Sequence, residues 1–165
     1  MKLRVGQGFD IHPFSPDTAR RLILGGVPVD GAPGLVGHSD ADAVGHAIID
    51  ALLGAAQLGD IGGHFADRDP RWKDADSMVL LAATVELVRS CGWDIENVDC
   101  TVVAEIPRLA PVREAMQTRL SAIVGAPVSV KAKRAEQLGA IGRSEGIACF
   151  AVALLTGTPP SGESK

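Results

Sequence analysis

Hydrophobic residues follow two spacings along the chain, and together they predict an α+β fold. Alternating apolar and polar positions rich in β-branched residues predict strands. Apolar residues at three- and four-residue steps predict helices that bury one face. The predicted strands are residues 3–12, 98–105, 128–133 and 147–156, with two short strands at 21–25 and 27–29 that form a hairpin arm. The predicted helices are residues 39–58, 77–91 and 112–124.

The first of these helices has the clearest pattern. Ser39 and Asp42 have the spacing of a capping box, although Asp stands in place of the usual Glu. An apolar stripe that we expect to enter the core consists of Val44, Ala47, Ile48, Ala51, Leu52 and Ala55. A second row, at steps of four residues, presents carboxylate, imidazole and carboxylate from Asp42, His46 and Asp50.

The elements fit one domain with a layered architecture. No repeat or linker divides the chain, so we expect a single domain over residues 1–157 and a disordered tail over the Pro/Gly/Ser-rich residues 158–165. The expected fold is a mixed four- to five-stranded sheet with three helices on one face. Because the strands are apolar on more than one side, we expect the other face to be covered by an oligomer that packs sheet against sheet.

Composition excludes several classes of protein. With 46% hydrophobic and 22% charged residues, the 165-residue chain is too apolar for intrinsic disorder. A net charge of −4, with only four Phe, two Trp and no Tyr, argues against nucleic-acid binding. No apolar run approaches the roughly 20 residues of a membrane span, and the N-terminus lacks a signal-peptide core, so we expect a cytoplasmic protein.

Three widely spaced cysteines indicate neither a disulfide framework nor a thiolate zinc site. Cys91, Cys100 and Cys149 include no C-x-x-C pair. We therefore interpret them as buried thiols in a reducing compartment.

Three residues form a candidate metal site. Asp10 and His12 alternate on a strand and therefore face the same side, and His46 lies on the first helix. A lone Asp-x-His is more often an ordinary polar pair, but the joint pattern of two imidazoles and a carboxylate suits a divalent ion such as zinc. Three protein ligands would leave a position for substrate or water. We interpret His64 as a solvated loop residue rather than a ligand.

Two groups of residues are candidates for anion binding. His38 and Ser39 precede a helix, where free N–H groups favour an anion, although Ser39 can equally serve only as a cap. A second group consists of four cationic residues around a strand end and a glycine-rich turn: Lys131, Lys133, Arg134 and Arg143. These residues could bind an anion, or they could be an ordinary charged edge in contact with solvent. Among them, Glu136 could neutralise these cations or hold magnesium on a phosphate.

A metal together with cationic phosphate contacts points to phosphoryl chemistry. A dinucleotide fold is rejected, because Ile11 occupies the place of the third glycine in G-x-G-x-x-G and no βαβ unit follows. The chain also lacks a P-loop and a G-x-S-x-G elbow.

Four motifs in order resemble the 2-C-methyl-D-erythritol 2,4-cyclodiphosphate synthase family across residues 3–156. They are G-x-G-F-D-x-H at residues 6–12, G-H-S-D-x-D at 37–42 followed by His46, L-G-D-I-G at 58–62, and G-R-x-E-G-I-A at 142–148. The resemblance implies a homotrimer of the non-mevalonate isoprenoid pathway with active sites between subunits. It also implies the cyclisation of 4-diphosphocytidyl-2-C-methyl-D-erythritol 2-phosphate to the 2,4-cyclodiphosphate, with release of CMP.

The resemblance also implies roles for individual residues. Asp10, His12 and His46 would hold zinc. His38 and Ser39 would contact the attacking phosphate, and the catalytic residues would be His38, which stabilises the transition state, and Arg134, at the position of the residue that assists it. Asp60, Ile61 and Gly62 would bind ribose, and residues 65–69, with Phe65, Asp67 and Asp69, would form a substrate loop. Glu136 would hold magnesium on the substrate diphosphate, and Arg143 would bind phosphate. The cytosine pocket would be formed by residues 104–110, including Ala104, Pro107, Arg108, Leu109 and Ala110.

The chain departs from the family pattern at residues 133–135, where many members have a Thr run. Lys133 and Arg134 occupy the phosphate-contacting positions, and we expect Arg134 to bind phosphate through its charge or its backbone N–H. Ala140 and Phe150 likewise replace residues that line the central cavity of the family's trimer. Two alternatives stay open: a metal- and cytidine-nucleotide-binding homologue with little or no turnover, and a metal-dependent phosphate-ester hydrolase.

Overall fold

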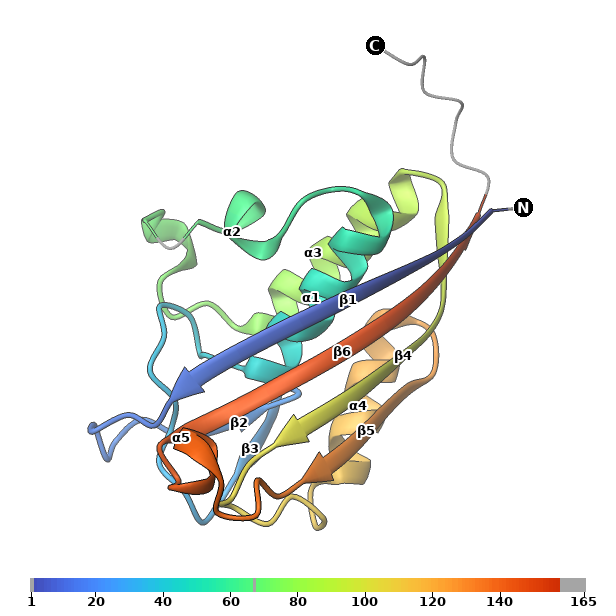
Figure 1. Cartoon of the computed structure of the whole chain (residues 1–165). Coiled ribbons are helices and arrows are strands. Elements are labelled where there is room, and N and C mark those ends of the chain that lie inside the picture. The colour runs from blue at the N-terminus through green and yellow to red at the C-terminus, as the bar shows by residue number, and fades with distance from the viewer. Residues whose placement is uncertain (1, 67, 158–165) are drawn as a thin grey trace.

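A mixed four-stranded sheet forms the centre of the molecule (Figure 1). The computed structural model describes residues 2–66 and 68–157, so the predicted tail lies outside the described residues. Strand β6 is antiparallel to both of its neighbours, and β4 and β5 are parallel, which confirms the predicted mixed sheet. In spatial order the strands are β1 (Lys2–Pro13), β6 (Gly146–Gly157), β4 (Trp93–Val103) and β5 (Val128–Lys133).

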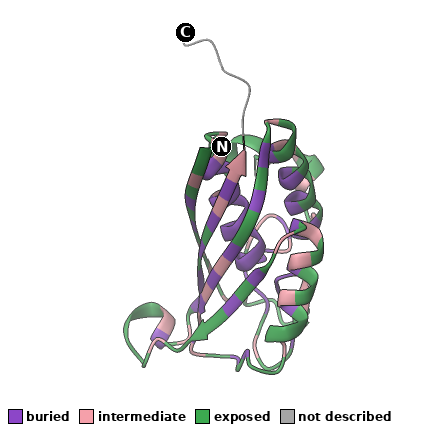
Figure 2. Cartoon of the chain, turned by 90° about the vertical axis from the view of Figure 1, so that its right-hand side faces the viewer, coloured by how far each residue is buried: buried purple, intermediate pink, exposed green. Residues whose placement is uncertain are grey.

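Three long helices cover one face of the sheet, as predicted (Figures 1 and 2). They are α1 (Ala43–Ala56), α3 (Ser77–Ser90) and α4 (Arg113–Val124). The whole predicted stripe of α1 is buried between the sheet and α3. The hairpin arm is formed by β2 (Leu22–Leu24) and β3 (Val27–Val29). The short elements are α2 (Ile61–His64), the 3₁₀ helix η1 (Pro70–Trp72) and α5 (Gly139–Gly142).

Two predicted boundaries are wrong. Helix α1 begins at Ala43 with Asp42 as its N-cap, so Ser39 precedes the helix and does not cap it. Strand β4 begins at Trp93 instead of residue 98, since Trp93 and Ile95 bury alternate side chains directly after the α3 turn.

The contact between β1 and α1 is unusually close. A Cβ atom on Gly6 would lie 2.0 Å from the backbone oxygen of Ala51, and one on Gly8 would lie 1.9 Å from that of Ala47. Only glycine leaves room for this approach of strand and helix backbones. Asp10 and His12 follow on the same face of β1, so this contact places both beside α1.

The sheet face opposite the helices carries exposed apolar residues. Odd-numbered residues of β1 and even-numbered residues of β6 point to this side, and the rings of Phe9 and Phe150 lie 4.8 Å apart across the two strands. Figure 2 shows the alternation of buried and exposed positions along the strands. The exposed apolar residues of β1 and β6 are Leu3, Val5, Phe9, Ile11, Phe150 and Val152.

Cys100 and Cys149 are buried as predicted, whereas Cys91 is half-buried. Among the described residues, no helix combines the length and apolar character needed to cross a membrane.

Replacing Gly8 by alanine should destabilise the protein by about 3 kcal/mol, because the new methyl group meets the backbone oxygen of Ala47 instead of a side chain that could move. Chemical denaturation of the G8A variant, monitored by circular dichroism, measures this loss.

Gly54→Ala is the matched control on the same pair of elements. Gly54 is an exposed residue of α1, and a Cβ there would have only the Gln7 oxygen as a neighbour, at 4.0 Å. The G54A variant should gain about 0.5–1 kcal/mol from helix propensity. Equal stability of the two variants would contradict the close-contact explanation.

Candidate active site

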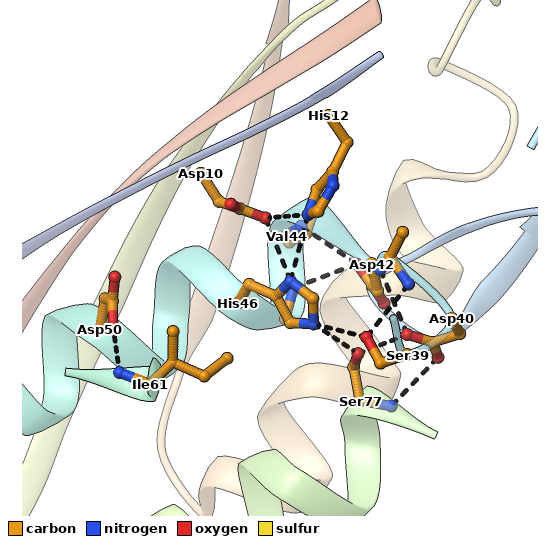
Figure 3. A network of polar contacts seen from close by, with 12 residues as sticks. Asp10, His12, Ser39, Asp40, Asp42, Val44, His46, Asp50, Ile61 and Ser77 are labelled. Atoms are coloured by element: carbon orange, nitrogen blue, oxygen red, sulfur yellow. Dashed lines mark hydrogen bonds and ion pairs between the residues drawn. The ribbon is translucent and has the colours of Figure 1, made fainter. Parts of the chain in front are cut away.

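Asp10, His12 and His46 converge in one cluster, as the sequence predicts (Figure 3). Asp10 Oδ2 lies 2.9 Å from His12 Nε2 and 3.1 Å from His46 Nδ1, and the two ring nitrogens are 3.4 Å apart. One ligand atom from each residue falls within 4.8 Å of the others. A carboxylate oxygen with two imidazole nitrogens fits a divalent metal of the zinc type.

Hydrogen bonds on the far side of each imidazole orient the two histidines. His12 Nδ1 lies 2.7 Å from the carbonyl oxygen of Val36, to which it can only donate. This bond leaves Nε2 of His12 directed toward Asp10 and His46. On His46 the outward nitrogen is Nε2, which contacts the hydroxyls of Ser39 and Ser77.

The pKa values of the cluster reflect mutual attraction. Burial raises the pKa of Asp10, but hydrogen bonds and charge interactions with His12 and His46 outweigh burial and lower it from 3.8 to about 2. Burial lowers the pKa of His12, but the hydrogen bond and charge of Asp10 outweigh it and raise that pKa. Without a metal, the cluster therefore favours an anionic Asp10 beside a cationic His12.

The cluster opens into a cleft of about 220 Å³. Besides Asp10, His12 and His46, this cleft brings together five predicted site residues: His38, Ser39, Ile61, Gly62 and Phe65. His38 Nε2 is buried and has no hydrogen-bond partner within the described ranges, which fits a group that binds a polar ligand. Trp72 and Leu80 also line the cleft, although neither belongs to a sequence motif.

The loop that carries His38 and Ser39 is tied down on both sides. Arg20 Nη2 donates to the carbonyl oxygens of Gly37 at 3.3 Å and Ser39 at 2.5 Å. On the other side, the Asp74 N–H donates to the carbonyl oxygen of His38 at 2.9 Å. These bonds hold His38 at the mouth of the cleft.

The start of α2 is held by the side chain of Asp50. Its Oδ1 accepts the Ile61 N–H at 2.8 Å. Burial raises the pKa of Asp50, and the Ile61 bond opposes this rise. Asp50 therefore supports the Ile61–Gly62 wall of the cleft instead of joining the metal ligands.

Asp42 anchors the helix that carries His46. Its carboxylate is fully buried and accepts four backbone N–H groups, from Gly25, Gly26, Val44 and Gly45. Burial raises the pKa of Asp42, and the bonds from Gly45 and Gly26 oppose that rise. One side chain thus caps α1 and joins it to the turn of the β2–β3 hairpin.

A second cavity, of about 200 Å³, lies at the ends of β4 and β5. Glu105 lines it as well, and its Oε1 pairs with Arg134 Nη2 at 3.0 Å. Glu105 falls within the predicted segment 104–110, but nothing in the sequence indicates its ion pair with Arg134. The predicted residues that line this cavity are Ala104, Pro107, Arg108, Leu109, Ala110, Lys133 and Arg134.

Four predicted site residues line neither cavity. The Asp60 side chain caps α2, and Asp69 pairs with Arg71 at the start of η1. Arg143 donates to Glu145 at 2.7 Å, and Glu136 is exposed in the turn before α5 with a positive φ of 51°. Asp67 lies outside the described residues. His64 is exposed as predicted, but it is the last residue of α2 and not part of a loop.

The two cavities lie at opposite edges of the sheet. β1, which carries Asp10 and His12, is one edge strand, and β5, which carries Lys133, is the other. The cavities share no lining residue.

Comparisons with known proteins agree on one family. The family model described as the YgbB family matches residues 3–156. The 2-C-methyl-D-erythritol 2,4-cyclodiphosphate synthase of Laribacter hongkongensis is 56% identical over 158 residues, which cover 94% of this chain and 96% of the relative.

Solved structures of this family have the same fold. The bifunctional IspDF from Campylobacter jejuni matches with a TM-score of 0.90 and 38% identity over 96% of this chain, which spans 43% of the IspDF chain. IspF of Plasmodium falciparum in complex with CDP matches with a TM-score of 0.81 and 34% identity, over 94% of this chain and 97% of that one.

Replacing Asp42 by alanine should cost about 3–5 kcal/mol of stability, because four N–H groups lose their acceptor inside the fold. Asp76→Ala is the control: Asp76 caps α3 through a single bond to the Met78 N–H, and its loss should cost about 1 kcal/mol. Denaturant titration of both variants measures the difference, and equal losses would refute the joining role of Asp42.

The metal-free protein should lose stability in acid through Asp10. Because the folded-state pKa of Asp10 is lowered to about 2, its contribution is present above pH 4 and is lost as the pH falls toward 2. Between pH 4 and pH 2, the free energy of unfolding of the wild type should fall by about 2 kcal/mol more than that of Asp10→Asn. Parallel pH profiles of the two proteins would contradict this assignment.

Proposed function

The chain belongs to the YgbB family, and on that premise we propose that it converts 4-diphosphocytidyl-2-C-methyl-D-erythritol 2-phosphate to 2-C-methyl-D-erythritol 2,4-cyclodiphosphate and CMP. The observation that carries the proposal is the convergence of Asp10, His12 and His46 beside His38, whose Nε2 has no partner in the described part of the chain. The family match over residues 3–156 supports it.

The Asp10–His12–His46 cluster holds a divalent metal, which we assign as zinc from the donor set. When bound, zinc supplies a Lewis acid for a substrate phosphate oxygen. The protein's own contribution is to present one carboxylate and two imidazoles whose outward nitrogens are already hydrogen-bonded.

The phosphate groups are bound by residues from both ends of the fold. His38 and Ser39 contact the attacking 2-phosphate, and His38 Nε2 is free to hydrogen-bond it. Lys133, Arg134 and Arg143 supply positive charge for the diphosphate, and Glu136 helps to hold magnesium on it. Arg134 replaces a Thr of many relatives, and its guanidinium provides charge at that position.

The cytidine part fits the second cavity. Backbone groups of the segment from Ala104 to Ala110 read the base there. The solved IspF structure of P. falciparum is a complex with CDP, which supports a nucleotide site in this fold. Asp60, Ile61 and Gly62 bind the ribose, while the segment with Phe65, Asp67 and Asp69 covers the substrate.

The reaction needs no external nucleophile, because the 2-phosphate attacks the β-phosphate of the same molecule. The new P–O bond closes the ring while the bond to CMP breaks. Catalysis therefore consists mainly of holding the two phosphates together and neutralising their charge.

The active molecule is a homotrimer that packs through the free sheet faces. The exposed apolar residues of β1 and β6 supply the surface for this contact. The two cavities lie at opposite edges of one sheet, so a neighbouring subunit would bring the β5 edge of one chain to the β1 edge of the next. This arrangement completes a site that each chain holds only in halves.

³¹P NMR of the purified protein with substrate, zinc and magnesium tests the function. We expect CMP and the cyclic diphosphate to appear together. Unchanged substrate would instead indicate the binding homologue with little turnover, and a linear hydrolysis product would indicate a phosphate-ester hydrolase.

The variant His46→Ala should lose both zinc retention, measured by elemental analysis, and activity. His64→Ala is its control, since His64 is an exposed histidine whose Nε2 contacts only the carbonyl oxygen of Leu58 in the described structure. Full zinc content in the folded H46A variant would overturn the ligand assignment.

Sedimentation equilibrium should give the mass of three chains for the wild-type protein. For the Val5→Glu variant it should give the mass of a single chain. Val5 is 69% exposed on the free sheet face, where a buried charge would oppose packing. Val79→Glu, at a 61% exposed site on α3, should remain trimeric. A wild-type monomer would refute the proposed assembly.

A further inference from the structure

The outward nitrogen of His46 contacts two buried hydroxyl groups (Figure 3). His46 Nε2 lies 2.9 Å from Ser77 Oγ and 3.1 Å from Ser39 Oγ. Ser77 is the first residue of α3 and is fully buried, so water cannot replace this contact. The fold therefore decides which of the two groups, His46 Nε2 or Ser77 Oγ, donates the hydrogen bond between them.

The proton of the Ser77 hydroxyl is already committed. Ser77 Oγ donates to the Oδ1 of Asp40, and the Ser77 N–H donates to the Oδ2 of Asp40 at 3.0 Å. A carboxylate can only accept, so the hydroxyl must be the donor in its bond to Asp40. Ser77 Oγ then faces His46 with a lone pair, and His46 Nε2 must carry the proton that joins them.

We propose that Asp40 and Ser77 are positioning residues that keep the proton of His46 on Nε2 and turn Nδ1 toward Asp10 and His12, as a metal ligand requires. When no metal is bound, the 3.1 Å contact of Nδ1 with the Asp10 carboxylate suits a donor, so the proposal concerns the proton on Nε2 alone. The use of Nδ1 as a metal ligand rests on the proposed function.

The opposite tautomer conflicts with the observed contacts. If His46 Nδ1 carried the proton and donated to Asp10, Ser39 could donate to Nε2, but the lone pairs of Nε2 and Ser77 Oγ would face each other at 2.9 Å. That repulsion could be relieved only by withdrawing the Ser77 proton from Asp40.

We call the chain of hydrogen bonds from Asp40 through Ser77 to His46 the relay. Asp40 also connects this relay to the loop that carries His38 and Ser39. Its backbone N–H donates to the carbonyl oxygen of Ala75 at 3.1 Å, and its carboxylate accepts the Asp42 N–H at 3.2 Å. One aspartate thus joins the segment of His38 and Ser39 to the start of α3 and, through Ser77, to His46.

The first experiment determines the tautomer of His46 in the metal-free wild-type protein. Long-range ¹H–¹⁵N NMR of ¹⁵N-histidine-labelled protein distinguishes a protonated ring nitrogen from one with a lone pair. The chain has only four histidines, so single variants assign the signals. We expect a proton on Nε2 of His46 at pH 8.5, and an Nε2 that carries a lone pair, as in the Nδ1–H form, would overturn the proposal.

The second experiment measures zinc affinity of Ser77→Ala by competition with a chromogenic chelator. The variant keeps the backbone bond from residue 77 to Asp40 and the Asp76 cap of α3, so the helix start is preserved. Affinity should fall by about 10- to 100-fold, and the NMR signal of His46 should show mixed tautomers. Ser90→Ala should leave both unchanged, because Ser90 is an exposed residue of the same helix whose hydroxyl, among residues 2–66 and 68–157, bonds only the Leu87 oxygen.

The two measurements separate failure of the relay from failure of the metal site. A wild type that shows the Nε2–H form but binds no zinc would support the relay and refute the metal proposal. Unchanged zinc affinity and an unchanged tautomer in a folded S77A variant would refute the relay. If S77A does not fold, the wild-type tautomer alone decides.

Discussion

The close contact of β1 with α1 is the constraint on which the site depends. Gly6 and Gly8 let the strand lie against the helix backbone, and Asp10 and His12 continue the same strand face. His46 directly precedes Ala47, whose backbone oxygen would collide with any side chain at position 8. The packing that forms the core thereby sets the spacing of the three ligand atoms, and stability and metal binding are linked through the same backbone contact.

Three aspartates, of which Asp42 is fully buried and Asp40 and Asp50 are half-buried, organise the segments around that contact. Asp42 joins the start of α1 to the hairpin turn, Asp50 supports the start of α2, and Asp40 links the His38 loop to α3. Each accepts backbone N–H groups that would otherwise lack partners. A short carboxylate can satisfy several donors at once, so one residue can connect elements distant in the chain.

The same sheet serves two purposes on its two faces. The helix face forms the core, while the opposite face presents apolar residues from β1 and β6. The proposed trimer would bury this second face and join two half-sites from opposite edges. In that arrangement, assembly and catalysis depend on the same strands.

The sequence alone determined the mixed sheet, the three helices, the Asp10–His12–His46 cluster and the family, because periodicity and local motifs carry that information. It misassigned the cap of α1, since Ser39 and Asp42 are both good caps and only the hairpin's Gly25 and Gly26, distant in the chain, select Asp42. It did not indicate Trp72, the ion pair of Glu105 with Arg134 or the contact of Ser77 with His46. These depend on cavity walls or on side chains that meet across 29 and 31 residues, and so only tertiary packing decided them.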